Sequence, residues 1–318
     1  LMRTPENIID GAYRYIVIIF WGIPVTYLYN LVSGIIRSMG DSRTPVVFLV
    51  IAAVINIGLD LFFIVVLGTG VEGAAWATVI SQLISCILVL WCLYKSEGSY
   101  QLRFSKLQIK GVYLKQIFQV GIPAGIQSMI INFSNVLLQS SVNSFGSTAM
   151  AGYTAANNIL GFLYAAVNSI TQACMSFTSQ NYGVGKYKRM DKVLIDCLIL
   201  TVVVAGLLGC GSYLLGPEIL RIYTEEEKVI RCGMEILSIT TVPYFLCGIM
   251  DLFPGALRGM GYSAVPMILS IIGTVGMRVV WIFGIFPHHR SLYVLFISYP
   301  GSWLFTIIMQ VICFYFVR

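Results

Sequence analysis

Four charged side chains fall inside long apolar stretches of the sequence: Asp60, Asp196, Asp251 and Arg278. A charged group within a bilayer must be paired, neutralised or hydrated, so each of the four is a candidate functional residue. Asn56 precedes Asp60 by four residues, which places the two side chains on one face of a helix. Together they offer oxygen atoms that coordinate Na⁺, and the carboxylate can also exchange a proton.

The apolar stretches around Asp60 predict how these groups are positioned. Residues 45–67 form a span that runs outward, and Asp60 then lies about 10 Å from its outer end. Residues 73–94 form the next span, which runs inward, with Thr78 about 8 Å from the same end. Asn56, Asp60 and Thr78 are therefore predicted to form one cation or proton site. The structural alternative is that Asp60 only binds neighbouring backbone and never titrates.

The other charged groups have simpler expected roles. Arg278 lies about 14 residues into its span, well separated in depth from Asp251, so the two are not expected to pair. Arg278 either binds backbone carbonyls as a structural lock or contacts a substrate. Asp196 lies near a cytoplasmic helix start, where the helix dipole favours a carboxylate, and is expected to be structural.

The composition indicates an integral membrane protein. Of the 318 residues, 58% are hydrophobic and 11% are charged, with a mean hydropathy of +0.84. Soluble domains carry about 25% charged residues, and the apolar content excludes a disordered chain. A transmembrane helix needs about 20 mostly apolar residues. Nine stretches qualify: 13–34, 45–67, 73–94, 121–143, 149–178, 193–216, 231–257, 264–286 and 292–317.

The distribution of Lys and Arg predicts the orientation of the chain. With the first residues placed outside, the inner loops hold 13 of these residues and the outer loops hold six. The positive-inside rule then places the C-terminus in the cytoplasm of a multi-pass protein of the cell membrane. The net charge of +6 accordingly suits anionic lipid headgroups and does not indicate nucleic acid.

The long inner loop, residues 95–120, predicts an interfacial amphipathic helix. Its apolar residues fall near one helical face and two lysines lie off that face: Phe104, Leu107, Leu114 and Phe118, with Lys106 and Lys110. The loop divides the chain into residues 1–94 with three spans and residues 121–318 with six. We expect these to be the remainder of an N-lobe and a complete C-lobe.

An internal repeat supports this division. Residues 33–45 (SGIIRSMGDSRTP) and 254–266 (PGALRGMGYSAVP) agree at six of thirteen positions at a constant offset of 221. Six spans separate the copies, so the two units have the same orientation, as in transporters built from parallel repeats. The same offset predicts that the partner of the span at 121 begins about a hundred residues before residue 1. We therefore expect the chain to lack three N-terminal helices.

The sequence resembles multidrug and toxic compound extrusion (MATE) transporters, as helices four to twelve of twelve. The motifs that carry the resemblance are IIRSMGDSRTP (35–45), NIGLDLFFI (56–64), GVEGAAWATVISQ (70–82), AANNI (155–159) and SQNYGVGKYKRMD (179–191). The resemblance implies an all-α polytopic bundle in two lobes around a central cavity. It also implies antiport of bulky, often cationic organic molecules against H⁺ or Na⁺.

The resemblance further implies which residues couple ions to transport. Asn56, Asp60 and Thr78 correspond to an N-lobe cation site whose fourth member, an Asp on the first helix, is absent from this chain. Asp251 corresponds to an acid of a C-lobe site, and it aligns with Asn30 at the offset of 221. The partner acid on the seventh helix is missing, since residues 121–143 offer only Gln127, Asn132, Asn135 and Gln139. The polar side chains that would line the substrate cavity are Asn132, Asn157, Asn158, Gln172 and Arg278.

Secondary active export of organic compounds by alternating access is thus the predicted function. A lipid-linked oligosaccharide flippase of the same superfamily is the alternative, but it would need a more cationic cavity than Arg278 alone provides. An inactive fragment and a membrane-embedded prenyltransferase are two further alternatives; against the latter, the sequence has no second aspartate cluster for Mg²⁺-pyrophosphate.

No cofactor and no enzymatic activity are expected, and the expected partners are the small organic substrate, H⁺ or Na⁺, and the lipid bilayer. GVGK (183–186) lacks the spacing of a phosphate-binding loop. The eight cysteines never occur as CxxC, so beyond Na⁺ at the coupling site no metal is expected. We expect a monomer.

Overall fold

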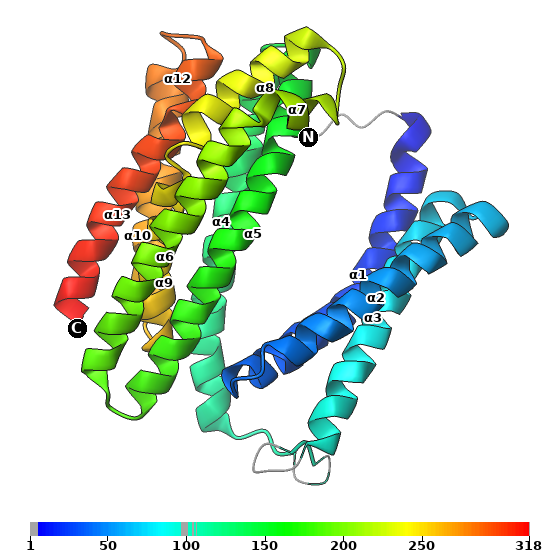
Figure 1. The fold of residues 1–318 in the computed structure, drawn as a ribbon, viewed down its shortest axis with the longest axis vertical. Coiled ribbons are helices and arrows are strands. Elements are labelled where there is room, and N and C mark those ends of the chain that lie inside the picture. The colour runs from blue at the N-terminus through cyan, green and yellow to red at the C-terminus, as the bar shows by residue number, and fades with distance from the viewer. Residues whose placement is uncertain (1–5, 97–100, 104, 106, 318) are drawn as a thin grey trace. The chain divides into compact units, whose positions relative to one another are not determined.

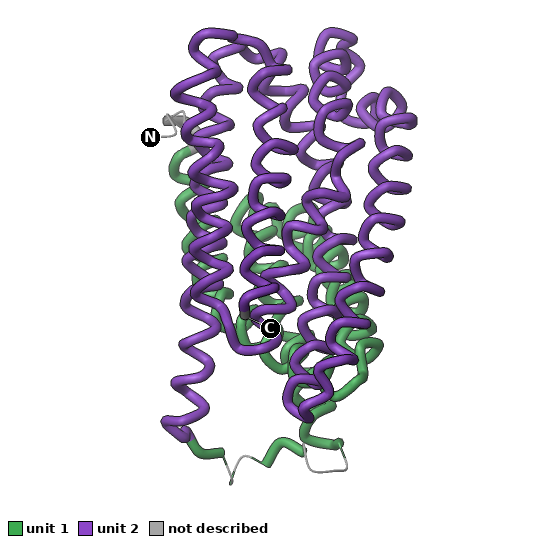
Figure 2. The backbone as a smooth tube through the Cα atoms, turned by 90° about the vertical axis from the view of Figure 1, so that its left-hand side faces the viewer, with its two compact units in different colours: residues 1–108 green, residues 109–318 purple. Residues whose placement is uncertain are grey.

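The computed structural model describes residues 6–96, 101–103, 105 and 107–317, and within them every regular element is helical. Eight helices are long and apolar enough to cross a membrane, and a bent helix pair forms a ninth span. The nine predicted spans are thereby confirmed as helices, and the chain is an all-α polytopic bundle. Contacts divide it into two compact units, residues 1–108 and 109–318 (Figure 2).

Unit 1 consists of three packed helices (Figure 1). They are α1 (Glu6–Ser38), α2 (Arg43–Leu61), which the π-helical η1 (Phe62–Val66) continues, and α3 (Gly70–Lys95). The Tyr29 hydroxyl donates to the Pro45 carbonyl at 2.9 Å, which ties α1 to the start of α2. An ion pair of 2.8 Å between Arg14 and Glu72 joins α1 to the first turn of α3.

Unit 2 is a larger helical bundle in which α5 packs against α6, α8 and α9 (Figure 1). Its apolar core is formed mainly from these helices and the last span. The elements are α4 (Gly111–Asn143), α5 (Ser147–Gly183), α6 (Tyr187–Leu214), α7 (Gly216–Arg221), α8 (Glu227–Thr240), α9 (Tyr244–Gly259), α10 (Ala264–Ser270), η3 (Ile271–Gly276), α11 (Met277–Val280), η4 (Trp281–Ile285), α12 (Leu292–Phe296) and α13 (Ser298–Val317).

The span made of α8 and α9 bends by 50°. Proline lacks an amide hydrogen and ends a regular helix, and Pro243 occupies the position directly before α9. Gly209 of α6 faces this bend, and a side chain there would collide with the Thr241 carbonyl oxygen. The bend and the close approach of α6 therefore depend on each other.

The internal repeat is confirmed in the bounds of the helices. Shifting α1 by 221 residues gives 227–259, the range that α8 and α9 cover together, and α2 shifted in the same way begins at Ala264, the first residue of α10. The helix ends agree in detail. Gly40 and Gly261 have φ angles of 97° and 92°, a left-handed conformation that favours glycine.

The hydrogen bonds around these two glycines also match. Asp41 N–H donates to the Ile36 carbonyl, and Tyr262 N–H donates to the Leu257 carbonyl. Both closures follow the Schellman pattern that ends a helix at a glycine. The copies in 33–45 and 254–266 are therefore the same helix–turn–helix joint, which supports a duplicated fold.

The segment between the units differs from the sequence-based expectation. Residues 107–110 are not helical, and Leu114 and Phe118 lie in the first turns of the 33-residue helix α4. The apolar period of these turns continues into Ile122 without a break, so one long helix forms in place of a separate interfacial one. Phe104 and Lys106, which belonged to that expectation, lie outside the described residues.

Candidate functional site

Three of the four predicted coupling residues, Asn56, Asp60 and Thr78, lie on the two packed helices of a hairpin in unit 1. This hairpin consists of α2 with η1 and of α3, and Thr69 lies at its turn. Asp60 precedes Thr69 by nine residues and Thr78 follows it by nine. At about 1.5 Å of rise per residue, both side chains lie about 13 Å from the turn. The structure thus brings Asp60 and Thr78 to the same level of neighbouring helices.

Two polar side-chain atoms on α2 lack partners within the described residues. Asp60 Oδ1 and Asn56 Nδ2 are buried, and neither makes a hydrogen bond within the described residues. Burying a polar atom without a partner costs roughly 1–3 kcal/mol in proteins, so such atoms require an explanation. Asp60 also makes no ion pair in the part of the chain that the structure describes. The backbone hydrogen bond that the structural alternative requires is thus not seen for Asp60 within the described residues.

Gln82 is a further member of this group that the sequence reasoning missed. Its Oε1 is buried without a partner, like the atoms of Asn56 and Asp60. Gln82 follows Thr69 by thirteen residues, and Asn56 precedes Thr69 by thirteen. Asn56 and Gln82 therefore lie at about the same distance from the turn. The signal was present in the sequence, because Thr78 and Gln82 repeat on α3 the four-residue spacing of Asn56 and Asp60 on α2.

Thr78 has oxygen lone pairs available. Its hydroxyl donates to the Ala74 carbonyl one turn earlier, at 3.0 Å. The hydrogen is thereby used, and the oxygen can still accept a hydrogen bond or coordinate a cation. The Asn56 amide presents its oxygen in place of nitrogen when it is turned by 180°. Four residues in two helices can thus supply oxygens: Asn56, Asp60, Thr78 and Gln82.

Asp251 lies in a separate polar cluster in unit 2. Arg258 follows Asp251 by two helical turns on α9, and the two charges interact without forming a close ion pair. The Arg258 guanidinium donates to Gln127 of α4, with 2.5 Å between Nη2 and Oε1. Tyr164 of α5 also interacts electrostatically with Asp251.

Arg278 is the most deeply buried charged side chain among the described residues, with 4% of its surface exposed. Its Nη1 donates to Asn135 Oδ1 of α4 at 3.1 Å. The guanidinium carbon lies 4.1 Å from the centre of the Tyr299 ring on α13, within the range of a cation–π contact. Within the described residues Arg278 makes no hydrogen bond to a backbone carbonyl, so the carbonyl lock considered from the sequence is not seen there.

The remaining predicted cavity residues are exposed side chains. Asn157, Asn158 and Gln172 lie on α5 and Asn132 lies on α4. None of them makes a side-chain hydrogen bond to Arg278 or to any other residue that the structure describes. Polar side chains left exposed on a membrane span face a cavity or another helix, since lipid cannot bind them.

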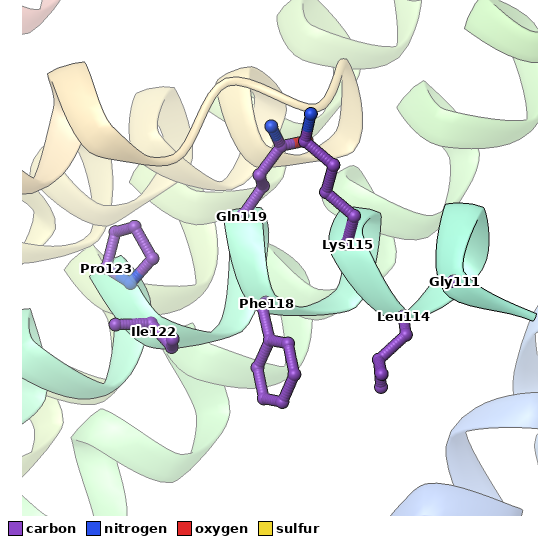
Figure 3. A pocket seen from close by; sticks show the side chains of 7 residues that line it. All are labelled: Gly111, Leu114, Lys115, Phe118, Gln119, Ile122 and Pro123. Atoms are coloured by element: carbon purple, nitrogen blue, oxygen red, sulfur yellow. The ribbon is translucent and has the colours of Figure 1, made fainter. Parts of the chain in front are cut away.

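A shallow groove lies elsewhere in unit 2, along the first turns of α4 (Figure 3). Leu114 and Phe118 point to one side of this helix, and Lys115 and Gln119 point to the other. A single helix lines the groove, and neither Asp251 nor Arg278 contributes to it. The groove is therefore not part of either polar cluster.

The helical spans and the charged groups among them define a class of protein: a polytopic membrane transporter. The family model described as MatE matches residues 1–62 and 123–283, more than half of the sequence. The chain belongs to the MatE family, whose members are transporters and not enzymes.

Relatives and solved structures agree with this placement. The chain is 27% identical to YoeA, a probable multidrug resistance protein of Bacillus subtilis, over 97% of this chain and 68% of YoeA. It is 26% identical to NorM, a probable multidrug resistance protein of Thermotoga maritima, over 83% of this chain and 57% of NorM. The chain therefore spans between about half and two thirds of these relatives.

The fold is also that of solved MATE proteins. A crystal structure of MATE in complex with MaL6 aligns with a TM-score of 0.91, covering 99% of this chain and 72% of that chain at 21% sequence identity.

Proposed function

We propose that this chain belongs to a secondary active antiporter that exports organic, often cationic, drug-like compounds in exchange for H⁺ or Na⁺ by alternating access. The names of YoeA and NorM, which refer to multidrug resistance, support the substrate class. A location in the cell membrane with a cytoplasmic C-terminus, and a monomeric state, complete the proposal. The division into an N-lobe and a C-lobe also stays a proposal.

The observation that carries ion coupling is the set of unpartnered polar atoms in the hairpin of α2 and α3. Asn56, Asp60 and Gln82 each hold one such atom, and they lie on the two packed helices of an apolar hairpin. A bound cation or proton relieves the cost of their burial, and its release restores that cost.

This difference in burial cost between the ion-bound and ion-free hairpin allows the ion to change which conformation the protein adopts. A ligand shifts a two-state protein only by its different affinity for the two states. In the proposal, the hairpin binds the ion in the state that releases the organic substrate outward. Asp60 carries or loses the charge, and Thr78, Asn56 and Gln82 supply neutral oxygens around it. Asp251 is proposed as a second coupling residue, with Arg258 and Tyr164 as its electrostatic neighbours.

The test uses Asp60→Asn in the complete protein, reconstituted in vesicles with a fluorescent organic cation inside. Wild-type protein is expected to export the dye when an inward H⁺ or Na⁺ gradient is imposed, each gradient being applied separately. Asp60→Asn keeps the size of the side chain and removes its charge, so gradient-driven export should fall at least about tenfold while the protein remains folded.

Asp196→Asn is the matched control, because Asp196 is an exposed acid on α6 that makes no ion pair within the described residues. It should export the dye at the wild-type rate. Undiminished gradient-driven export by Asp60→Asn would overturn the proposal.

A further inference from the structure

Unit 2 contains a buried positive charge that has no acidic partner within the described residues. The last three spans hold three charged side chains that are at least partly buried: Asp251, Arg258 and Arg278. Asp251 interacts with Arg258, which leaves Arg278 without a counter-charge within the described residues. A buried guanidinium keeps its proton at any physiological pH, so the imbalance cannot be relieved by deprotonation.

The neighbours of Arg278 orient the guanidinium without neutralising it. Asn135 is an amide and accepts one hydrogen bond at Nη1. Tyr299 offers the face of its ring. Both partners are neutral, and both come from other helices, α4 and α13. They hold the guanidinium in a fixed plane between three spans.

One edge of this guanidinium is left open. Nε is buried and has no hydrogen-bond partner. Nη2, on the same side, makes no hydrogen bond in the described structure and is not among the fully buried atoms. These two N–H groups form the parallel fork with which arginine binds a carboxylate in a bidentate manner. Asn135 and Tyr299 beside it are only partly buried, so the edge lies near an accessible surface.

Arg258 also has a buried Nε without a partner, but its Nη2 donates to Gln127, so Arg278 differs in leaving both N–H groups of this edge open within the described residues. When a buried charged group lacks a hydrogen-bond partner, the free-energy cost is larger than the stability that an ordinary hydrogen bond contributes. The chain supplies an amide at Asn135 where an aspartate of the same shape would have paired the charge. The guanidinium of Arg278 is therefore available to a negatively charged group from outside the chain.

We propose that Arg278 is the residue that binds the carboxylate of a carboxylate-bearing organic substrate, through the open Nε–Nη2 edge of its guanidinium. The inference rests on the proposed transport function and names part of its substrate class. Asn135 and Tyr299 are positioning residues for the guanidinium, and the Nε–Nη2 edge binds the ligand.

The experiment compares two dyes that differ in one group. Rhodamine 19 carries a free carboxylate, and rhodamine 6G is its ethyl ester. Binding of each dye to the purified complete protein in lipid nanodiscs is measured by fluorescence anisotropy, without an ion gradient. Arg278→Gln should raise the Kd for rhodamine 19 at least about tenfold, because a charge-assisted bond is lost. The Kd for the ester should change less than about twofold.

Asn135→Asp is the decisive second variant, because it keeps the shape of the side chain and supplies the missing counter-charge. Under the proposal it also weakens rhodamine 19 selectively. If Arg278 only links helices, Asn135→Asp strengthens that link and leaves both Kd values unchanged, which would overturn the proposal. Equal weakening of both dyes by Arg278→Gln would overturn it as well.

Arg290→Gln is the matched control, since Arg290 is an exposed arginine of unit 2 that belongs to neither polar cluster, and it should leave the preference for the carboxylate intact. The binding assay does not depend on ion coupling. A protein that binds rhodamine 19 through Arg278 but shows no gradient-driven export would contradict the proposed function and leave this inference standing.

Discussion

Asp60 and Arg278 carry opposite charges into apolar helical units, and each retains a polar atom without a partner. The neighbours of both are neutral: amides and a hydroxyl on the hairpin, and an amide and an aromatic ring around Arg278. Neutral neighbours orient a charge and leave it available to a ligand of the opposite sign. In our proposals, the same arrangement of neutral neighbours binds a cation in unit 1 and an anion in unit 2.

Gln82 tests whether the cation site extends beyond the three residues that the sequence predicts. Gln82→Leu removes one oxygen and fills its space with an apolar group. We expect the ion concentration for half-maximal transport to rise about tenfold, as for the loss of one hydrogen bond to a charged group. Gln139→Leu, on the exposed face of α4, is the control and should behave as wild type. An unchanged ion dependence in Gln82→Leu would restrict the site to Asn56, Asp60 and Thr78.

Asp41 provides a prediction for how the stability of the folded protein depends on pH. Its carboxylate accepts hydrogen bonds from the Thr44 hydroxyl and from the backbone N–H groups of Thr44 and Arg43 at the start of α2. The Thr44 hydroxyl is the main reason that the pKa of Asp41 lies below its ordinary value. A lowered folded-state pKa stabilises the protein above the unfolded-state pKa of about 3.9, and this contribution is lost as the pH falls through the folded-state pKa.

Asp41→Ala should therefore lower the thermal unfolding midpoint at pH 7 by a small amount, because the side chain is exposed. The difference from wild type should shrink as the pH falls below about 4. A deficit that is constant from pH 7 to pH 3 would mean that the ionised carboxylate does not stabilise α2.

The helices themselves follow from the apolar pattern, and their joints follow from a few glycines and prolines. All nine spans were predictable because their length matches the bilayer. The 50° bend between α8 and α9 was not, because Pro243 alone does not say whether a span bends or breaks. The extension of α4 back to Gly111 was missed for another reason: polar residues in its first turns hid a helical period that was already present.

The close packing of α6 on that bend depends on the absence of a side chain at Gly209. A β-carbon at Gly209 would meet the Thr241 carbonyl oxygen, which is backbone and cannot move aside, whereas Gly206 on the same helix has open space. Gly209→Ala should lower the thermal midpoint of the purified protein in detergent. Gly206→Ala should leave it unchanged or raise it slightly, because alanine favours a helix over glycine by about 1 kcal/mol. If the two variants unfold at the same temperature, the close packing at the bend is not important for stability.

At the scale of the whole chain, the repeat was the most informative part of the sequence. Six identical residues in thirteen predicted a duplicated joint, and the structure reproduces its helix ends, its left-handed glycines and its backbone hydrogen bonds. The candidate sites were less predictable, because the repeat conserves helices and not side chains. At the offset of 221, Asp60 corresponds to Trp281 and Thr78 to Tyr299, the ring on which Arg278 lies.

That difference means that the two units are not chemically equivalent. The hairpin of unit 1 presents a carboxylate and neutral oxygens, whereas the equivalent helices of unit 2 present an aromatic ring beside a guanidinium. The proposed transporter would therefore exchange its cation at Asp60 in one half of a duplicated fold. In the other half, Asp251 and Arg278 would handle a second ion and the substrate.

Ion movement driven by the substrate tests this account most directly. Vesicles containing the complete protein are given an outward gradient of a cationic dye, with equal H⁺ and Na⁺ concentrations on both sides. In wild type, the departing dye should drive uptake of H⁺ or Na⁺, measured with a pH-sensitive or Na⁺-sensitive probe inside. Asp60→Asn should abolish that uptake. Ion uptake that continues at the wild-type rate in Asp60→Asn would contradict the central claim.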